Sequence, residues 1–187
     1  LATLLSGRYK SIVVYPFSYK ELLDYHSKLE ELTPQRKQDL FEEYLSYGGF
    51  PGLLKYDPFE KKESLKDIYH SVILKDILNR SKIKNNKLLM KLMEYMITNT
   101  GQLFSSTKII NYILSNNKNL LEEEQFKKPS SNTVINYVHH AQDAFVLYET
   151  KNEDLVGKEV FKELEKYYVV DPGFYYIFRD ETRRSKG

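Results

Sequence analysis

The chain has 187 residues, of which 41% are hydrophobic and 29% are charged. This size allows one or two compact soluble units and excludes a large multidomain machine. A net charge of +2 and the lack of cysteine exclude strong overall attraction to nucleic acid, a disulfide framework, a thiolate zinc site and a cysteine nucleophile. No stretch approaches the roughly 20 consecutive apolar residues of a membrane span, so we expect a cytoplasmic protein with no membrane partner.

Both ends of the chain have the pattern of a fragment. Leu1 lies inside an apolar helical pattern, and no basic segment followed by an apolar stretch marks a secretory signal. The last residues, Arg183–Gly187, form a polar run that closes no packed element. We therefore expect a piece of a longer protein.

The N-terminal region predicts a strand and then a helix. Ile12–Tyr15 is apolar and β-branched, which predicts a short buried strand that ends at Pro16. Ser18 and Glu21 stand three residues apart before an apolar pair, and this capping-box spacing predicts the start of a helix.

Two further helices are predicted before residue 80. Thr33–Pro34 starts the first, with proline at the position where a missing amide costs nothing, and the glycine-rich turn Tyr47–Gly52 ends it. Asp57–Pro58, with Glu60 three residues after the aspartate, starts a long helix. Its buried stripe recurs every three or four residues and consists of Leu65, Ile68, Tyr69, Val72, Ile73 and Ile77.

The second half predicts three helices and then two strands. A helix from residue 86 carries three methionines at the spacing of core residues and stops at Gly101. Ser105–Thr107 caps a short helix that ends near Asn116, and Ser130 caps a third. Strands are predicted over 145–148 and 167–170, and Asp171–Gly173 closes the second one.

This order is that of a winged helix-turn-helix, in which the third helix faces a partner and the hairpin is the wing. The predicted fold class is mainly α: a helical connector plus a winged helix-turn-helix with a small β-hairpin. The predicted domains are residues 1–32, 33–80 (the connector), 81–178 (the winged helix) and 179–187 (a polar tail).

The motifs of several common chemistries are missing. No G-x-x-x-x-G-K-[ST] loop is present to hold nucleotide phosphates, and neither H-E-x-x-H nor G-x-S-x-G occurs. His139 and His140 are adjacent, so on a helix their side chains point about 100° apart and do not easily share a metal ion. We expect no metal site and no cofactor in this chain.

Several strings, taken in order, resemble a prokaryotic group of AAA-superfamily ATPases. Leu1–Tyr9 and Tyr15–Glu21 resemble the end of the ATPase core. The strings that resemble the uncharacterised domain following that core are Tyr47–Gly52, Ile73–Ile77, Asn99–Ser105, Ser131–Val134, Asp143–Phe145 and Lys166–Gly173. The resemblance covers nearly the whole chain.

This resemblance implies that the intact protein binds ATP and Mg²⁺ through a P-loop and an acidic strand upstream of Leu1. It also implies a nuclease-like domain after Gly187. Residues 1–32 would then be the C-terminal remnant of the ATPase core, and the missing ATPase and nuclease-like domains would be partners within the same protein. The chain itself is expected to be catalytically silent, while the intact parent hydrolyses ATP.

Arg8 carries the one catalytic hypothesis. The resemblance places it after the sensor segment, where an arginine finger could reach a γ-phosphate in the same or a neighbouring subunit. The alternative is a structural arginine that pairs with a carboxylate.

The third helix of the winged-helix pattern predicts contact with duplex DNA. The candidate residues are Lys127, Lys128, Asn132, Asn136, His139 and His140. From Ser130 to Asp143 the helix has no lysine or arginine, and a segment so poor in cations binds DNA weakly by itself. The competing interpretation is therefore a protein-interaction lid that couples the ATPase core to a partner or a neighbouring subunit.

Overall fold

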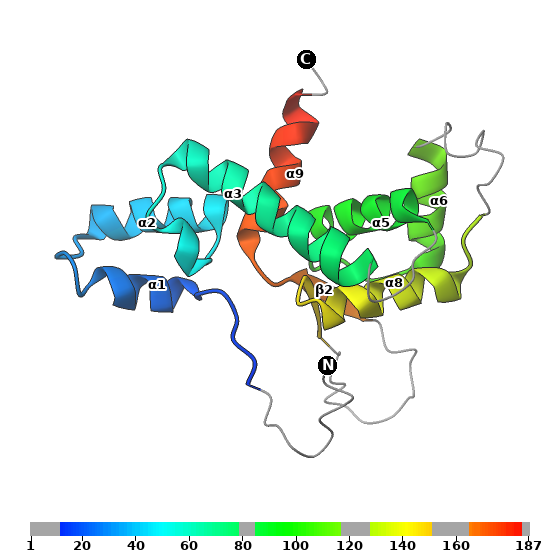
Figure 1. Ribbon diagram of the computed structural model, residues 1–187, viewed down its shortest axis with the longest axis horizontal. Coiled ribbons are helices and arrows are strands. Elements are labelled where there is room, and N and C mark those ends of the chain that lie inside the picture. Colours follow the sequence, from blue (N-terminus) through cyan, green and yellow to red (C-terminus); the bar gives the residue numbers. More distant parts are fainter. Residues whose placement is uncertain (1–11, 79–84, 117–127, 151–164, 185–187) are drawn as a thin grey trace.

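The computed structural model describes residues 12–78, 85–116, 128–150 and 165–184 (Figure 1). The described part is mainly helical with one small two-stranded antiparallel sheet, as the sequence predicted. Its helical elements are α1 (Tyr19–His26), α2 (Pro34–Tyr47), the 3₁₀ turn η2 (Pro51–Leu53), α3 (Pro58–His70), the π-helix η3 (Ser71–Leu78), α5 (Asn86–Thr98), α6 (Ser106–Asn116), α8 (Ser131–Asp143) and α9 (Pro172–Arg184). The strands are β1 (Leu147–Thr150) and β2 (Lys166–Val169).

The helix starts follow the local signals of the sequence. The Ser18 hydroxyl accepts a hydrogen bond from the backbone N–H of Glu21 (3.3 Å), and the Glu21 carboxylate accepts one from the N–H of Ser18 (2.8 Å). Asp57 and Glu60 form the same reciprocal pair at the start of α3. Each pair satisfies N–H groups that have no partner inside the helix, so both predicted capping boxes are confirmed.

The three helices α5, α6 and α8 are followed by the β1–β2 hairpin, in the predicted order. The strands pair antiparallel with Leu147 opposite Val169. The segment between α5 and α6 lies along the outer edge of β2: the N–H of Gly101 donates to the carbonyl of Tyr167 (2.8 Å) and that of Phe104 to the carbonyl of Glu165 (2.9 Å). The hairpin is thereby fixed to the helices, and Gly101 has the left-handed conformation expected of a helix stop (φ 79°).

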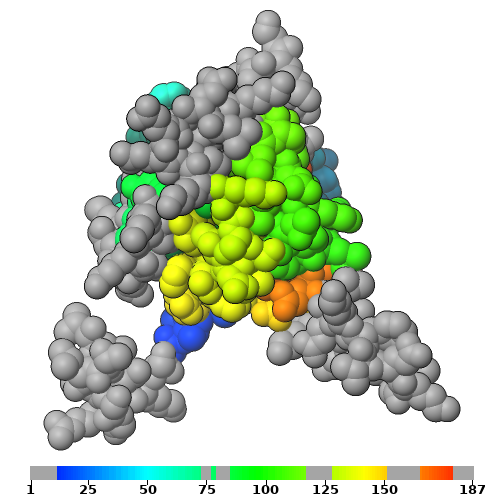
Figure 2. All heavy atoms as spheres, turned by 90° about the vertical axis from the view of Figure 1, so that its right-hand side faces the viewer, coloured from blue at the N-terminus to red at the C-terminus, as the bar shows by residue number. Residues whose placement is uncertain are grey.

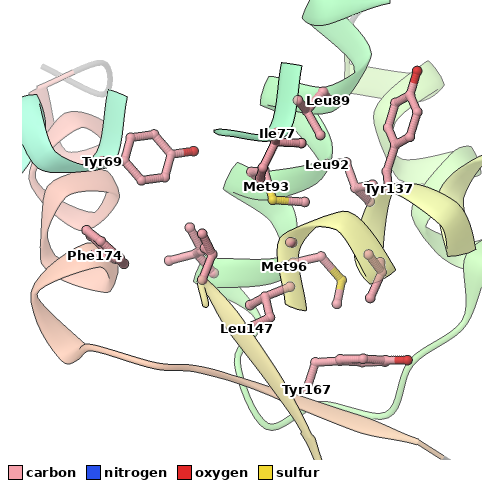
Figure 3. Packing of buried hydrophobic residues seen from close by; sticks show 14 of the residues in the cluster. Tyr69, Ile77, Leu89, Leu92, Met93, Met96, Tyr137, Leu147, Tyr167 and Phe174 are labelled. Atoms are coloured by element: carbon pink, nitrogen blue, oxygen red, sulfur yellow. The ribbon is translucent and has the colours of Figure 1, made fainter. Parts of the chain in front are cut away.

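One cluster of buried side chains runs from Leu53 to Ile177. Met93 and Met96 lie inside it (Figure 3), which confirms their predicted role as core residues. The cluster joins residues of α3 to residues of α5, α8, the hairpin and α9. The connector predicted for residues 33–80 and the unit predicted for 81–178 therefore share one core.

The predicted buried strand at Ile12–Tyr15 is wrong. These residues are exposed by 77%, 50%, 86% and 57% and adopt no strand among the described residues. A strand requires a neighbouring strand for its backbone hydrogen bonds, and the described hairpin pairs β1 with β2. The apolar pattern was interpreted as burial, whereas the side chains lie on the surface.

The helix α9 was not predicted at all. The sequence predicts a turn at Asp171–Gly173 and a polar tail from residue 179, but a helix begins at Pro172 and reaches Arg184. It packs against α2, α3 and α5 and stands between the α1–α2 end of the molecule and the α5–α6–α8 end (Figure 1). A Cβ on Gly173 would lie 2.8 Å from Leu65 Cδ2 and 2.8 Å from the Tyr47 carbonyl oxygen, so this close packing requires glycine.

A buried carboxylate, that of Asp171, connects the N-terminal helices to the start of α9. Asp171 is 1% exposed, and its side chain accepts a hydrogen bond from the N–H of Gly49 (2.8 Å) and another from that of Gly173 (2.8 Å). The carbonyl of Gly49 in turn accepts from the N–H of Phe17 (2.8 Å). We call this set of three hydrogen bonds the Asp171 joint. It connects the segment before α1, the turn after α2 and the start of α9.

Candidate docking and nucleic-acid-binding surfaces

The predicted DNA-contacting residues of α8 lie on its outer surface. Asn132, Asn136 and His139 are exposed, and their spacing of four and three residues places them on one face of the helix. His140 is half-buried, and Lys128 is exposed just before the helix. Figure 2 shows α8 in yellow across this side of the molecule, with α6 in green and β2 in orange beside it. Arg8 and Lys127 lie outside the described residues.

This face of α8 is uncharged apart from its ends. Val134, Tyr137, Val138 and Ala141 occupy the buried side of the helix. At its C-terminal end Asp143 is exposed, and Gln142 donates to the carboxylate of Glu149 (3.3 Å). Exposed lysines around this face include Lys128 before the helix, Lys108 near the start of α6 and Lys166 on β2. None of them lies on α8 itself, so the helix contributes no phosphate neutralisation of its own.

A second surface lies at the other side of the hairpin. The segment Ile12–Pro16, which we call the arm, lies outside any helix or strand, and its residues Val13–Pro16 form one wall of a groove of about 820 Å³. The residues lining the groove are Val13, Val14, Tyr15, Pro16, Phe17, Ser18, Glu21, Tyr44, Tyr148, Glu149 and Val170. The arm is therefore separated from β1 by open space large enough for a peptide segment.

Phe145, whose ring contacts that of Tyr15 in the arm, has a strained backbone conformation. Its φ of 56° is left-handed, and among the described residues no other non-glycine residue has a positive φ. The N–H of Val146 donates to the carbonyl of Ala141 (2.9 Å) and that of Phe145 to the carbonyl of Gln142 (3.0 Å), which is the Schellman pattern that usually has glycine at this position. The Phe145 side chain is nevertheless 51% exposed. An exposed aromatic ring at a position that favours glycine suggests a role in binding.

Aromatic rings join the arm and the hairpin. The ring of Tyr15 meets that of Phe145 edge-on at 6.1 Å between centroids. Tyr148 is 43% exposed, and its ring stacks on that of Tyr168 at 5.5 Å. Sequence reasoning missed this surface, because Phe145 was assigned to a strand and Ile12–Tyr15 to a buried strand, whereas Tyr148 does lie in β1. The signal present was an aromatic residue directly after a capped helix.

The electrostatic environment of the groove is negative. The carboxylate of Glu21 accepts hydrogen bonds from the N–H and the hydroxyl of Ser18 (both 2.8 Å), and these bonds lower its pKa, so it is charged at neutral pH. Burial raises the pKa of Tyr44, and the negative charges of Asp171 and Glu21 raise it further. Among the described residues that line the groove there is neither lysine nor arginine.

Two further kinds of site were sought among the described residues. No group of three or more histidine, aspartate or glutamate side chains gathers there as a metal site would require. No helix in that part of the chain combines the length and the apolar character needed to cross a membrane.

The fold is thus a mainly helical domain with one antiparallel hairpin. A family model described as "Domain of unknown function (DUF8612)" matches residues 38–184, and the chain belongs to this family. An uncharacterised protein of Haemophilus influenzae is 36% identical over 174 residues, which are 92% of this chain and 40% of that protein. Uncharacterised protein MJ1544 of Methanocaldococcus jannaschii is 27% identical over 177 residues, which are 91% of this chain and 38% of that protein. The chain thus spans about two fifths of the length of these relatives, and no solved structure matches it.

Proposed function

We propose that this chain is a non-catalytic docking module that attaches to a partner domain through the arm, Phe145 and Tyr148. The observation that carries the proposal is the exposure of four consecutive apolar residues, Ile12–Tyr15, in a segment without helix or strand. Isolated apolar residues are common on surfaces, but a continuous apolar stretch beside exposed aromatic rings marks an interaction site.

The partner that we propose is an ATPase core of the AAA superfamily, in the same protein or in a neighbouring subunit. Two observations support this choice. The strings Leu1–Tyr9 and Tyr15–Glu21 resemble the end of such a core, and the chain spans only about two fifths of its curated relatives. An extended β-branched segment docks by adding a strand to a sheet edge, where its backbone hydrogen bonds are satisfied. The module would then transmit the nucleotide state of the core.

Hydrogen exchange tests the proposal in the natural full-length protein. The amides of Ile12–Tyr15 should exchange at least about 100-fold more slowly in that protein than in the 187-residue chain, because strand pairing protects them. Equal, fast exchange in both would refute docking through the arm.

A matched pair of variants sharpens the test. Val14 is 86% exposed and Leu29 is 67% exposed, so replacing either with aspartate leaves the isolated chain within about 0.5 kcal/mol of its normal stability. In the full-length protein, Val14→Asp should remove the protection of the arm and change the rate of ATP hydrolysis, whereas Leu29→Asp should do neither.

Contact with duplex DNA through α8 is a second candidate function. It is favoured by the order of three helices and a hairpin and by the common exposed face of Asn132, Asn136 and His139. Binding of a duplex at two salt concentrations tests it. Lys128→Ala should lower the slope of log affinity against log salt by about one, while Lys20→Ala on α1 leaves the slope unchanged. Absence of binding at low salt would leave docking as the function.

A further inference from the structure

The groove beside the arm has two different walls. The arm and Ser18 form one wall, and the hairpin residues Tyr148 and Glu149 with Val170 form the other. Tyr44 of α2 also lines the groove. The stacking of Tyr148 on Tyr168 and the contact of Tyr15 with Phe145 hold the rings in place. The groove therefore has aromatic and apolar side chains at fixed positions along its length.

The charged side chains among the described residues that line the groove are both carboxylates. Glu21 projects from the first turn of α1 and Glu149 from β1, and both line the groove. Oε2 of Glu149 accepts a hydrogen bond from the side-chain amide of Gln142, which is uncharged. The negative charge of Glu149 therefore has no cationic partner among the described residues that line the groove. Two carboxylates in a groove with low-dielectric aromatic walls attract a cation and disfavour an anion.

We propose that this groove receives an extended segment of the partner in which apolar residues alternate with lysine or arginine. The inference rests on the proposed function and names the chemistry of the partner. Side chains of an extended segment point alternately to opposite sides, so apolar residues can contact Val13, Val14 and Val170 while basic residues reach Glu21 and Glu149. Tyr44 and Tyr148 also line the groove, and aromatic rings attract such cations.

The experiment measures the binding of three synthetic five-residue peptides of equal length to the 187-residue chain. They are acetyl-Val-Arg-Val-Arg-Val-amide and its two analogues in which glutamine or glutamate replaces both arginines. Affinity is measured by calorimetry at low and moderate salt, and the binding position by amide chemical shifts. The arginine peptide should bind at least about tenfold more tightly than the glutamine peptide, and the glutamate peptide should bind more weakly still. Raising the salt should reduce the difference.

Charge-neutralising variants supply the control. Glu149→Gln should weaken binding of the arginine peptide about three- to tenfold and leave the glutamine peptide unaffected. Glu31→Gln removes the same charge from an exposed residue outside the groove and should change neither. Equal affinities for all three peptides, no effect of Glu149→Gln, or shifts confined to residues away from the groove would each overturn the proposal.

The two proposals can fail separately. If the arm is protected from exchange in the full-length protein but the peptides do not differ in affinity, docking stands and a basic partner segment is wrong. If the arginine peptide binds in the groove but the arm stays unprotected in the full-length protein, the groove has the proposed preference and the docking function is wrong.

Discussion

Replacing Gly49 with alanine should destabilise the fold more than its small size suggests. A Cβ at this position would overlap the carbonyl oxygen of Phe17 and lie 2.8 Å from the carbonyl carbon. Backbone atoms cannot rotate away as a flexible side chain can, so Phe17 and Gly49 must separate. Two bonds of the Asp171 joint depend on their present positions: the one from the Phe17 N–H to Gly49 and the one from the Gly49 N–H to Asp171.

The magnitude follows from these two hydrogen bonds. A neutral backbone bond contributes about 1 kcal/mol and a bond to a charged acceptor about 1.5–3 kcal/mol. Losing both costs about 3 kcal/mol, which is a large fraction of the roughly 5–15 kcal/mol by which a domain is stable. For a chain of this length, that loss lowers the melting temperature by about 6–12 °C.

Gly52→Ala is the matched control, because nothing lies within 4 Å of a Cβ at that position. It should leave the free energy of unfolding unchanged or raise it by about 0.5 kcal/mol, since alanine restricts the unfolded chain. Both variants are compared by urea denaturation followed by circular dichroism. If Gly49→Ala loses less than about 1 kcal/mol, or Gly52→Ala loses as much, the joint does not stabilise the fold as described.

Three further predictions concern single side chains. Burial raises the pKa of Asp171 from 3.8 to about 6, so its folded form holds the proton more tightly. Relative to Asp171→Asn, the wild-type free energy of unfolding should fall by about 2 kcal/mol as the pH rises from about 4 to 7, and a flat difference would contradict this. Phe145→Gly should raise stability by about 0.5–1 kcal/mol, because glycine adopts a positive φ without strain, yet reduce docking of the full-length protein; a loss of stability in thermal unfolding would show that Phe145 mainly supports the fold. Lys61 is 7% exposed and paired with Glu43, which is 34% exposed. Lys61→Met should therefore lower the free energy of unfolding by less than about 1.5 kcal/mol, because the carboxylate of Glu43 stays hydrated and methionine keeps the apolar stem. A loss above about 3 kcal/mol in urea denaturation would show that the carboxylate depends on this cation.

Helical signals were predicted correctly at α8, where Ser130 caps the helix as its sequence indicated. Asn132, Asn136 and His139 are exposed on it, while their contact with DNA stays a prediction. Phe145 was assigned to a strand because its aromatic side chain favours one. The backbone instead turns left-handed there to end α8, a conformation for which the sequence usually supplies glycine.

The sequence by itself determined the starts of the first helices and, after residue 86, the order of α5, α6, α8 and the hairpin, but not α9. A capping box such as Ser18–Glu21 acts over three residues, and a buried helical face repeats every three or four, so both are visible in a short stretch. Asp171–Pro172 has the same cap-and-proline pattern as Asp57–Pro58. Its helix was missed because the following glycine indicated a turn.

Only the tertiary structure decided the position of α9, the exposure of the arm and the joint that connects them. Asp171 and Gly49 are separated by 122 positions, and no local pattern shows that a carboxylate and a backbone amide so far apart will share a hydrogen bond. The arm has the composition of a buried strand, but burial depends on a neighbouring strand rather than on composition. Contacts of this kind arise from the packing of whole elements, which is why they set the candidate docking surface and remain invisible in the sequence alone.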